Sequence, residues 1–248
     1  MSPEKMSKRQ ERREKIRQQE RRSRMVTIGL ITLGTALLVF AFIYPQFKSA
    51  GEIIAPTSVT NIPQSDGLGI GDSNAPATID VFEDFQCPAC QLFTEKTQPL
   101  IIEYLVNTGK ARLVFHHYPF IDGEGAGNGG ESDQAANASM CASEQGKFWD
   151  MQAIIYANWN GENIGNLSNR RLQAMAEKIS LNMDTFNNCF DDNKYQDDIQ
   201  ADFDLGVEMG VSGTPSVFVN GQQLGEDGRV PTFQDIAVVV DQIVNTAK

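Results

Sequence analysis

An uncharged apolar run near the N-terminus, residues 25–44 (MVTIGLITLGTALLVFAFIY), constrains this chain more than any other feature. At about 1.5 Å per residue, a helix of this length reaches about 30 Å, the thickness of the hydrocarbon core of a bilayer. Residues 1–24 carry ten Lys or Arg and four Glu, a local net charge of +6. By the positive-inside rule this basic segment stays cytoplasmic, so the sequence predicts a single-pass membrane protein whose remaining residues are extracytoplasmic.

A cleaved signal peptide is the main alternative for the same residues. The apolar run is longer than the roughly 7–15 residues of a signal-peptide core, and no Ala-x-Ala cleavage site follows it closely. Nucleic-acid binding by the basic segment is a second alternative, but residues 25–248 carry eleven basic and twenty-eight acidic residues, a net charge of -17. We therefore expect an uncleaved signal anchor at 25–44 in the cell membrane and no nucleic-acid partner.

The residues after the anchor divide into a spacer and a domain. Residues 45–68 contain three prolines and several Ser and Thr without helical periodicity, which is typical of a linker. The remaining residues, 69–248, have the length of a single domain.

Within 69–248 the pattern predicts a small α/β core with a helical insertion at about 121–205. A first strand at 77–85 leads into a helix that begins at Pro88, bends at Pro99 and ends near residue 107, and a second strand follows at 111–118. The other predicted elements are five helices (133–144, 148–157, 169–179, 183–190 and 195–209), a hairpin that turns at Asn220-Gly221 (216–220 and 222–224), and a closing helix (232–246).

A Cys-x-x-Cys motif, Cys87-Pro88-Ala89-Cys90, lies where the first strand meets the first helix of this domain. A thiol in the first turn of a helix faces unsatisfied N–H groups and the positive end of the helix dipole, which stabilise the thiolate. The spacing places both sulfurs on one side of that turn, close enough to form a disulfide. We expect Cys87 to be the nucleophile and Cys90 to resolve the mixed disulfide.

Half of a zinc site and an inert structural disulfide are the alternatives for this motif. Zinc would need two further ligands at a suitable spacing. The other cysteines are 48 residues apart without a pair motif, and the chain has only two histidines, His116 and His117. The sequence therefore predicts no metal site and no organic cofactor.

Three segments together resemble the DsbA-like thiol-disulfide oxidoreductases of the thioredoxin superfamily, and its membrane-tethered branch in particular. They are FEDFQCPACQLF, the segment from Cys141 to Trp149, and GVSGTPSVFVNG. The resemblance covers nearly all of 69–248. It implies a thioredoxin fold with a helical domain inserted before the third strand. It also implies that the Thr214–Pro215 bond is cis and faces the two cysteines, where it offers backbone groups to an extended substrate.

The sequence departs from this family in two places. The best-known oxidases have histidine where this chain has Ala89, so the Cys87 thiolate lacks one stabilising charge and the oxidising power should be less extreme. Relatives often carry a buried acid six positions before the first cysteine, where this chain has Val81. Glu83 lies on the same face of the predicted strand and could replace that acid, or it could be a solvent-facing carboxylate at the strand end.

The remaining cysteines, Cys141 and Cys189, fall in separate predicted helices of the insertion. In an exported domain two such cysteines most simply form a structural disulfide, and some relatives of the resembled family have a second bond. A second redox pair is the alternative, although neither cysteine lies in an activating motif.

These observations together predict a membrane-anchored extracytoplasmic thiol-disulfide oxidoreductase that introduces disulfides into exported polypeptides. The resemblance implies recycling by a membrane redox partner, either a quinone-linked oxidase or an electron carrier. A reductase or an isomerase of the same fold remains open, as does a non-catalytic thioredoxin-like binding module that retained the motif.

Overall fold

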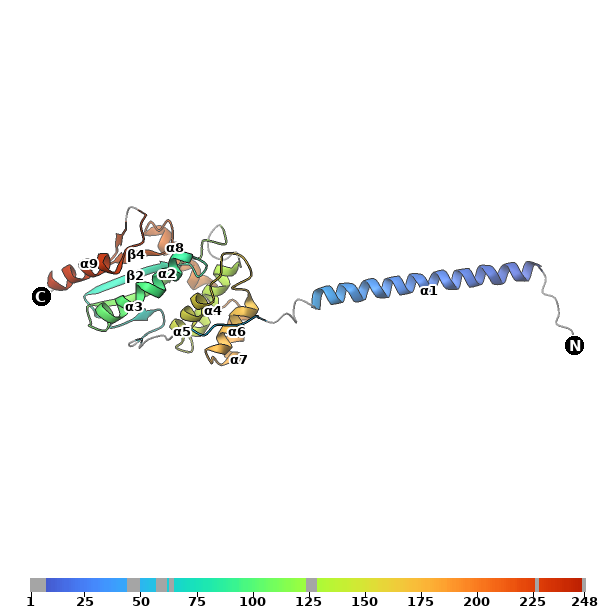
Figure 1. The fold of residues 1–248 in the computed structure, drawn as a ribbon, viewed down its shortest axis with the longest axis horizontal. Helices are drawn as coiled ribbons and strands as arrows, with labels where there is room; N and C mark the ends of the chain where they lie inside the picture. The colour runs from blue at the N-terminus through green and yellow to red at the C-terminus, as the bar shows by residue number, and fades with distance from the viewer. Residues whose placement is uncertain are drawn as a thin grey trace. The chain divides into compact units, whose positions relative to one another are not determined.

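The computed structural model describes residues 8–43, 50–56, 62, 65–123, 129–225 and 228–246. The chain divides into two compact units, Met1–Ser49 and Ala50–Lys248 (Figure 1). Half of the predicted spacer at 45–68, and Tyr44 at the end of the predicted anchor, lie outside the described residues.

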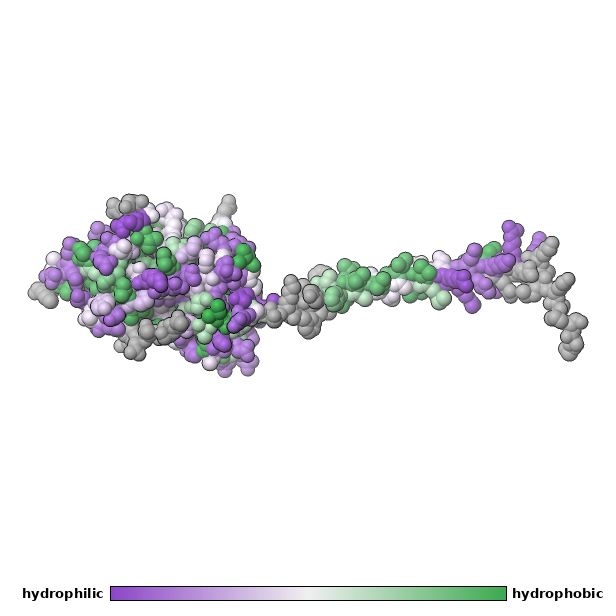
Figure 2. All heavy atoms as spheres, in the orientation of Figure 1, coloured by the Kyte–Doolittle hydropathy of each residue, from purple (hydrophilic) through white to green (hydrophobic). Residues whose placement is uncertain are grey.

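The first unit is a helix, α1 (Lys8–Ile43). It continues without a break from the basic segment into the apolar run, and Figure 2 shows the change from hydrophilic to hydrophobic residues along it. Large apolar side chains of the run are exposed, for example Met25 at 69% and Leu38 at 64%. By length and composition the stretch Lys15–Ala41 could cross a membrane, and it is the one such helix in the part of the chain that the structure describes.

The second unit is built on a mixed five-stranded sheet in the order β1-β3-β2-β4-β5. The central strand β2 (Ala77–Glu83) is parallel to β3 (Ala111–His117) and antiparallel to β4 (Ser216–Val219). The edges are β1 (Gly69–Ile70), which the sequence did not predict, and β5 (Gln222–Leu224). The turn between β4 and β5 has positive φ at both Asn220 and Gly221, as the predicted primed hairpin requires.

Helices cover both faces of this sheet. On one face pack α2 (Pro88–Lys96), α3 (Gln98–Ile101) and α9 (Phe233–Thr246), and they enclose the main apolar core. On the other face α8 (Gln196–Glu208) covers a smaller cluster formed by Phe82, Tyr118, Val211 and Phe218. The tyrosine ring there stacks on Phe203 with centroids 4.5 Å apart.

The predicted helix from 88 to 107 is wrong in one respect, because it is interrupted rather than bent. Pro99 has no N–H and cannot continue the hydrogen-bond ladder of α2, so α2 ends at Lys96 and α3 begins at Gln98. A π-helical turn, η2 (Ile102–Val106), follows, and its register is set by the bond from the N–H of Asn107 to the carbonyl of Ile102 at 2.8 Å.

The segment between β3 and β4 is mostly helical, and its helices agree with the predicted ones to within about two residues. Helices α4 to α7 gather at one end of the unit, beside the end of the sheet (Figure 1). Their bounds are α4 (Glu131–Ser143), α5 (Phe148–Ala157), α6 (Asn169–Lys178) and α7 (Met183–Asp191).

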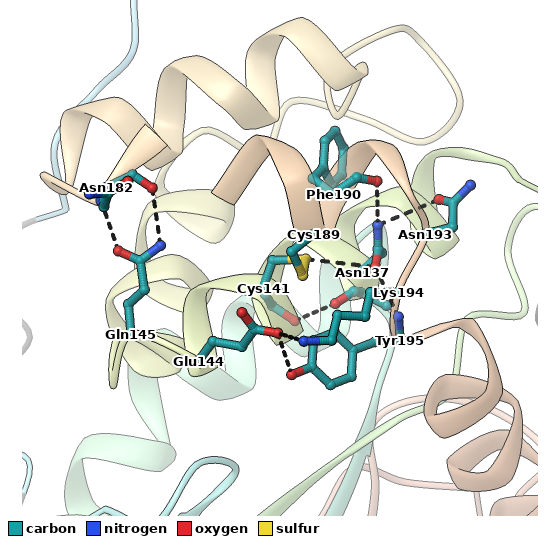
Figure 3. The surroundings of a disulfide bond; sticks show 12 residues. Asn137, Cys141, Glu144, Gln145, Asn182, Cys189, Phe190, Asn193, Lys194 and Tyr195 are labelled. Atoms are coloured by element: carbon teal, nitrogen blue, oxygen red, sulfur yellow. Dashed lines mark hydrogen bonds and ion pairs between the residues drawn. A yellow bond between two sulfur atoms is a disulfide. The ribbon is translucent and has the colours of Figure 1, made fainter. Parts of the chain in front are cut away.

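A disulfide between Cys141 and Cys189 joins α4 to α7, with the two Cα atoms 5.8 Å apart (Figure 3). Both cysteines are buried. Polar contacts support the same junction: the Asn137 side chain donates to the carbonyl of Phe190 at 3.0 Å, and the Tyr195 hydroxyl donates to Glu144 at 2.8 Å. The pairing matches the one expected for a structural bond.

Replacing both Cys141 and Cys189 by alanine should lower the free energy of unfolding by about 2–4 kcal/mol, because a crosslink across 48 residues constrains the unfolded chain. Denaturant unfolding under non-reducing conditions measures this change. The alkylation rate of Cys87 serves as the control and should not change. A variant with wild-type stability but altered Cys87 reactivity would instead favour a second redox pair.

Candidate functional site

Cys87 and Cys90 lie at the start of α2. Cys87 is the N-cap residue with extended backbone angles, φ -73° and ψ 123°, and Pro88 occupies the first turn, where its missing N–H leaves no bond unmade. The Cys87 residue is 6% exposed, whereas Cys90 is fully buried one turn further on. Both are free thiols in this structure, which therefore describes the dithiol form.

The loop before β4 brings Thr214 and Pro215 against these cysteines, although more than 120 residues separate them in sequence. The Thr214–Pro215 peptide bond is cis. The Sγ of Cys87 lies 3.2 Å from the carbonyl oxygen of Thr214. The structure therefore has the cis bond beside the cysteines that the family resemblance implies.

The two thiols have opposite acidities. A hydrogen bond from the Cys90 thiol is the largest cause that lowers the pKa of Cys87 to about 6; Thr214 and the backbone N–H groups of Ala89 and Cys90 act in the same direction, and burial opposes them. Burial raises the pKa of Cys90, and its hydrogen bond to Cys87 and the nearby charge of Glu83 add to that rise. At neutral pH Cys87 is a thiolate and Cys90 a thiol.

Ala89 contributes no charge at the position between Pro88 and Cys90. It is half-buried, and its neighbour Pro88 is exposed. The Cys87 thiolate is therefore stabilised by the Cys90 thiol, by Thr214 and by backbone N–H groups, and not by a cationic side chain at position 89.

Glu83 is 1% exposed at the end of β2, so the alternative of a solvent-facing carboxylate is wrong. Its Oε2 accepts hydrogen bonds from the Tyr156 hydroxyl at 2.7 Å and from the Thr94 hydroxyl at 3.4 Å. Its Oε1 is buried without a hydrogen-bond partner among the described residues. Burial raises the pKa of Glu83 to about 8, against the lowering effect of its two donors, and the charge of Cys87 adds to the rise.

The sequence did not single out two polar residues, Asp84 and Gln86, in the turn between β2 and α2 (residues 84–87, the active-site turn). Asp84 is 1% exposed and accepts four hydrogen bonds: from the N–H groups of Gln86, Phe120 and Ile121 and from the Ser132 hydroxyl. Gln86 is fully buried. The only signal in the sequence is that polar residues interrupt the apolar pattern of FEDFQ, and that pattern does not reveal their partners.

Tyr156 and Trp159, at and just after the end of α5, were also not singled out. Tyr156 is buried against the turn through its bond to Glu83.

Within the described ranges, no three His, Cys, Asp or Glu side chains are placed to hold a metal ion.

A family model described as thioredoxin matches residues 64–237. The chain belongs to the thioredoxin family. A probable disulfide bond formation protein D from Bacillus anthracis is 26% identical over 215 residues, which cover 86% of this chain and 90% of that protein. The crystal structure of Wolbachia pipientis alpha-DsbA1 matches with a TM-score of 0.61 and 25% identity, covering 75% of this chain and 95% of that one. The predicted thioredoxin fold is confirmed, and these similarities support a DsbA-like thiol-disulfide oxidoreductase.

One further relative is much longer than this chain. The Na(+)/H(+) antiporter NhaA 3 of Salinispora tropica is 32% identical over 153 residues, which cover 62% of this chain. The chain spans about a fifth (21%) of the length of that relative.

Titration of the reduced protein should show a thiolate appearing with a midpoint near pH 6, because the Cys87 pKa is lowered to about 6. Ultraviolet absorbance of the thiolate measures the midpoint. Cys87→Ser should abolish the transition. Cys90→Ala should move it to higher pH, since the Cys90 thiol is the largest stabilising donor. An unchanged midpoint in Cys90→Ala would contradict this account.

Glu83→Gln should stabilise the fold at neutral pH. A carboxyl whose pKa rises from about 4.5 to about 8 on folding favours the fold only while it is neutral, so its contribution is complete below pH 4.5 and is lost as pH rises towards 8. At pH 7 the variant should gain about 3 kcal/mol, and the gain should vanish below about pH 4.5. Unfolding measured across pH, with the exposed Glu95→Gln as the control, tests this; equal gains in both variants would contradict it.

Proposed function

We propose that this chain is a membrane-anchored extracytoplasmic oxidase of protein thiols, which transfers the Cys87–Cys90 disulfide to exported polypeptides. The observation that carries the proposal is the asymmetry of the two thiols. The leaving group Cys87 is a stabilised thiolate, and Cys90 is buried with a raised pKa. A pair whose reduced form is stabilised in this way favours giving its disulfide away.

In the first step a substrate thiolate attacks the Sγ of Cys87 in the oxidised protein. The new bond joins the substrate sulfur to Cys87, the Cys87–Cys90 bond breaks, and Cys90 leaves as a thiolate that takes up a proton. We assign this proton to Glu83, which burial keeps protonated at neutral pH and whose charge, when it is ionised, reaches Cys90 and raises the pKa of that thiol; solvent then returns a proton to Glu83.

In the second step another substrate thiol loses its proton and attacks the substrate sulfur of the mixed disulfide. The substrate disulfide forms and Cys87 leaves as the thiolate. Two electrons have passed from the substrate dithiol to the Cys87–Cys90 pair. The low pKa of Cys87 favours this departure, since a thiol of lower pKa leaves faster.

The substrate chain would lie along the loop that holds Thr214 and Pro215. Beside this loop is a hollow of about 310 Å³ whose lining includes Thr214, Pro215, Leu224 and Val230. This hollow offers space for side chains that flank the substrate cysteine, and the carbonyl of Thr214 already faces the reacting sulfur.

The location is inferred from α1. Its apolar side chains, among them Met25, Leu30 and Leu38, are exposed over a length that matches a bilayer. The basic residues before them favour a cytoplasmic N-terminus, so the second unit would be extracytoplasmic. A membrane redox partner, either a quinone-linked oxidase or an electron carrier, would then reoxidise the pair.

The reduction potential of the full chain in detergent should lie between roughly -200 and -120 mV, the range of known isomerases and oxidases. Equilibration with glutathione buffers, followed by alkylation and mass spectrometry of Cys87 and Cys90, measures it. The absence of a cationic side chain at Ala89 should place the value away from the oxidising end of this range.

A potential at or below about -270 mV would overturn the proposal in favour of a reductase. A pair that never exchanges with glutathione would leave a binding module. The Cys90→Ser variant provides the control, because it should form a stable mixed disulfide between Cys87 and glutathione.

A further inference from the structure

Gln86, the residue directly before the nucleophile, has a side chain that is fully buried among polar groups. Its Nε2 donates to the Ser132 hydroxyl at 2.9 Å and also to Asp122. Its Oε1 accepts from the backbone N–H of Asn163 at 2.6 Å. All three partners belong to the segment between β3 and β4, so one side chain fastens the active-site turn to that segment at several points.

The backbone of the same residue is held as well. The backbone carbonyl of Gln86 accepts a hydrogen bond from the indole N–H of Trp159 at 2.6 Å. The backbone N–H of Gln86 donates to the carboxylate of Asp84 at 2.8 Å. The N–H of Cys87, on the other side of the same peptide bond, donates to the carbonyl of Asp84 at 3.0 Å. The peptide unit that joins Gln86 to Cys87 is thus held at both ends, at its carbonyl by Trp159 and at its N–H by Asp84, the residue directly after β2.

The orientation of this peptide unit determines where the Cys87 sulfur lies. Rotation of the unit would move Sγ relative to the groups that contact it, which include the Cys90 thiol, the N–H groups of Ala89 and Cys90 and the carbonyl of Thr214. Small displacements change such contacts strongly, because hydrogen bonds weaken steeply with distance and angle.

We propose that Gln86 is a positioning residue for Cys87: together with Trp159 it ties the peptide before the nucleophile to the segment between β3 and β4, and so sets how strongly the thiolate is stabilised. The inference rests on the proposed function, since it concerns the same reacting sulfur. The carboxylates that face Gln86 are Asp84 and Asp122, and the titratable groups that interact with Cys87 are Cys90 and Glu83.

The chain offers a matched control in the buried pair Gln98 and Gln152. Their side-chain amides donate to each other at 3.0 and 3.2 Å and join α3 to α5. The pair therefore links the same two parts of the chain through an equally buried glutamine, but neither residue adjoins a cysteine in sequence or bonds to one.

The test compares Gln86→Met, Trp159→Phe and Gln152→Met in the full chain. Methionine keeps the length of glutamine and removes its hydrogen bonds, and phenylalanine removes the indole N–H that holds the Gln86 carbonyl. The thiolate titration of Cys87, the rate of its reaction with a small aromatic disulfide and the melting temperature are measured for each.

We expect all three variants to melt at lower temperature. In Gln86→Met and Trp159→Phe the Cys87 midpoint should also rise by on the order of one pH unit, which lowers the thiolate fraction at pH 6 about fivefold. In Gln152→Met the midpoint should stay at the wild-type value. Trp159→Phe keeps the test decisive should Gln86→Met fail to fold.

Wild-type midpoints in both Gln86→Met and Trp159→Phe would overturn the inference and reduce Gln86 to a structural contact. The reduction potential of the wild-type protein separates this failure from that of the proposed function. A potential in the reductase range would overturn the oxidase assignment, while the effect of Gln86 on the midpoint could still be observed.

Discussion

The last residue of β2 and the active-site turn that follows it bury three polar side chains within four residues, Glu83, Asp84 and Gln86. The rest of the structure depends on how these groups are hydrogen-bonded. An unsatisfied buried polar group costs about 1–3 kcal/mol, so a turn of this composition cannot be stable on the sheet alone. Its partners come from outside the sheet, chiefly Ser132 and Tyr156. The helices between β3 and β4 are therefore part of the active site as well as a cover for it.

The two neighbouring carboxyl groups, Asp84 and Glu83, differ in how completely they are hydrogen-bonded, and this difference sets their chemical roles. Asp84 accepts four hydrogen bonds, which is close to the capacity of a carboxylate, and it serves to close the turn. Glu83 has donors on one oxygen only, and burial raises its pKa to about 8. Neighbouring carboxyls thus have different roles: Asp84 fixes geometry, and Glu83 holds an exchangeable proton beside Cys90.

Whether the sequence could predict a feature of the fold or the site depends on how far apart in the chain the interacting residues are. The thiol pair, the Asn220-Gly221 turn and most helix bounds follow from local patterns, and the structure contains them. The break at Thr97 was not predicted, because Pro99 indicated a bend and only packing decides between a bend and two helices. The side-chain bonds of Gln86 to Asp122, Ser132 and Asn163 span 36 to 77 positions, and the bond of Glu83 to Tyr156 spans 73, so no local pattern encodes these partners.

The charges of the reduced site are coupled, and this coupling links the electron transfer to protons. In the dithiol form Cys87 carries a negative charge at pH 7, and that charge helps to keep the Glu83 proton in place. Oxidation removes the thiolate charge and takes the proton from Cys90. The Glu83 pKa then falls by the contribution of that charge, while burial, the largest cause, still holds it above its usual value. Reduction by a substrate restores the thiolate and with it the neutral carboxyl. Electrostatic repulsion between Cys87 and Glu83 thus makes the proton uptake of the buried site follow its redox state.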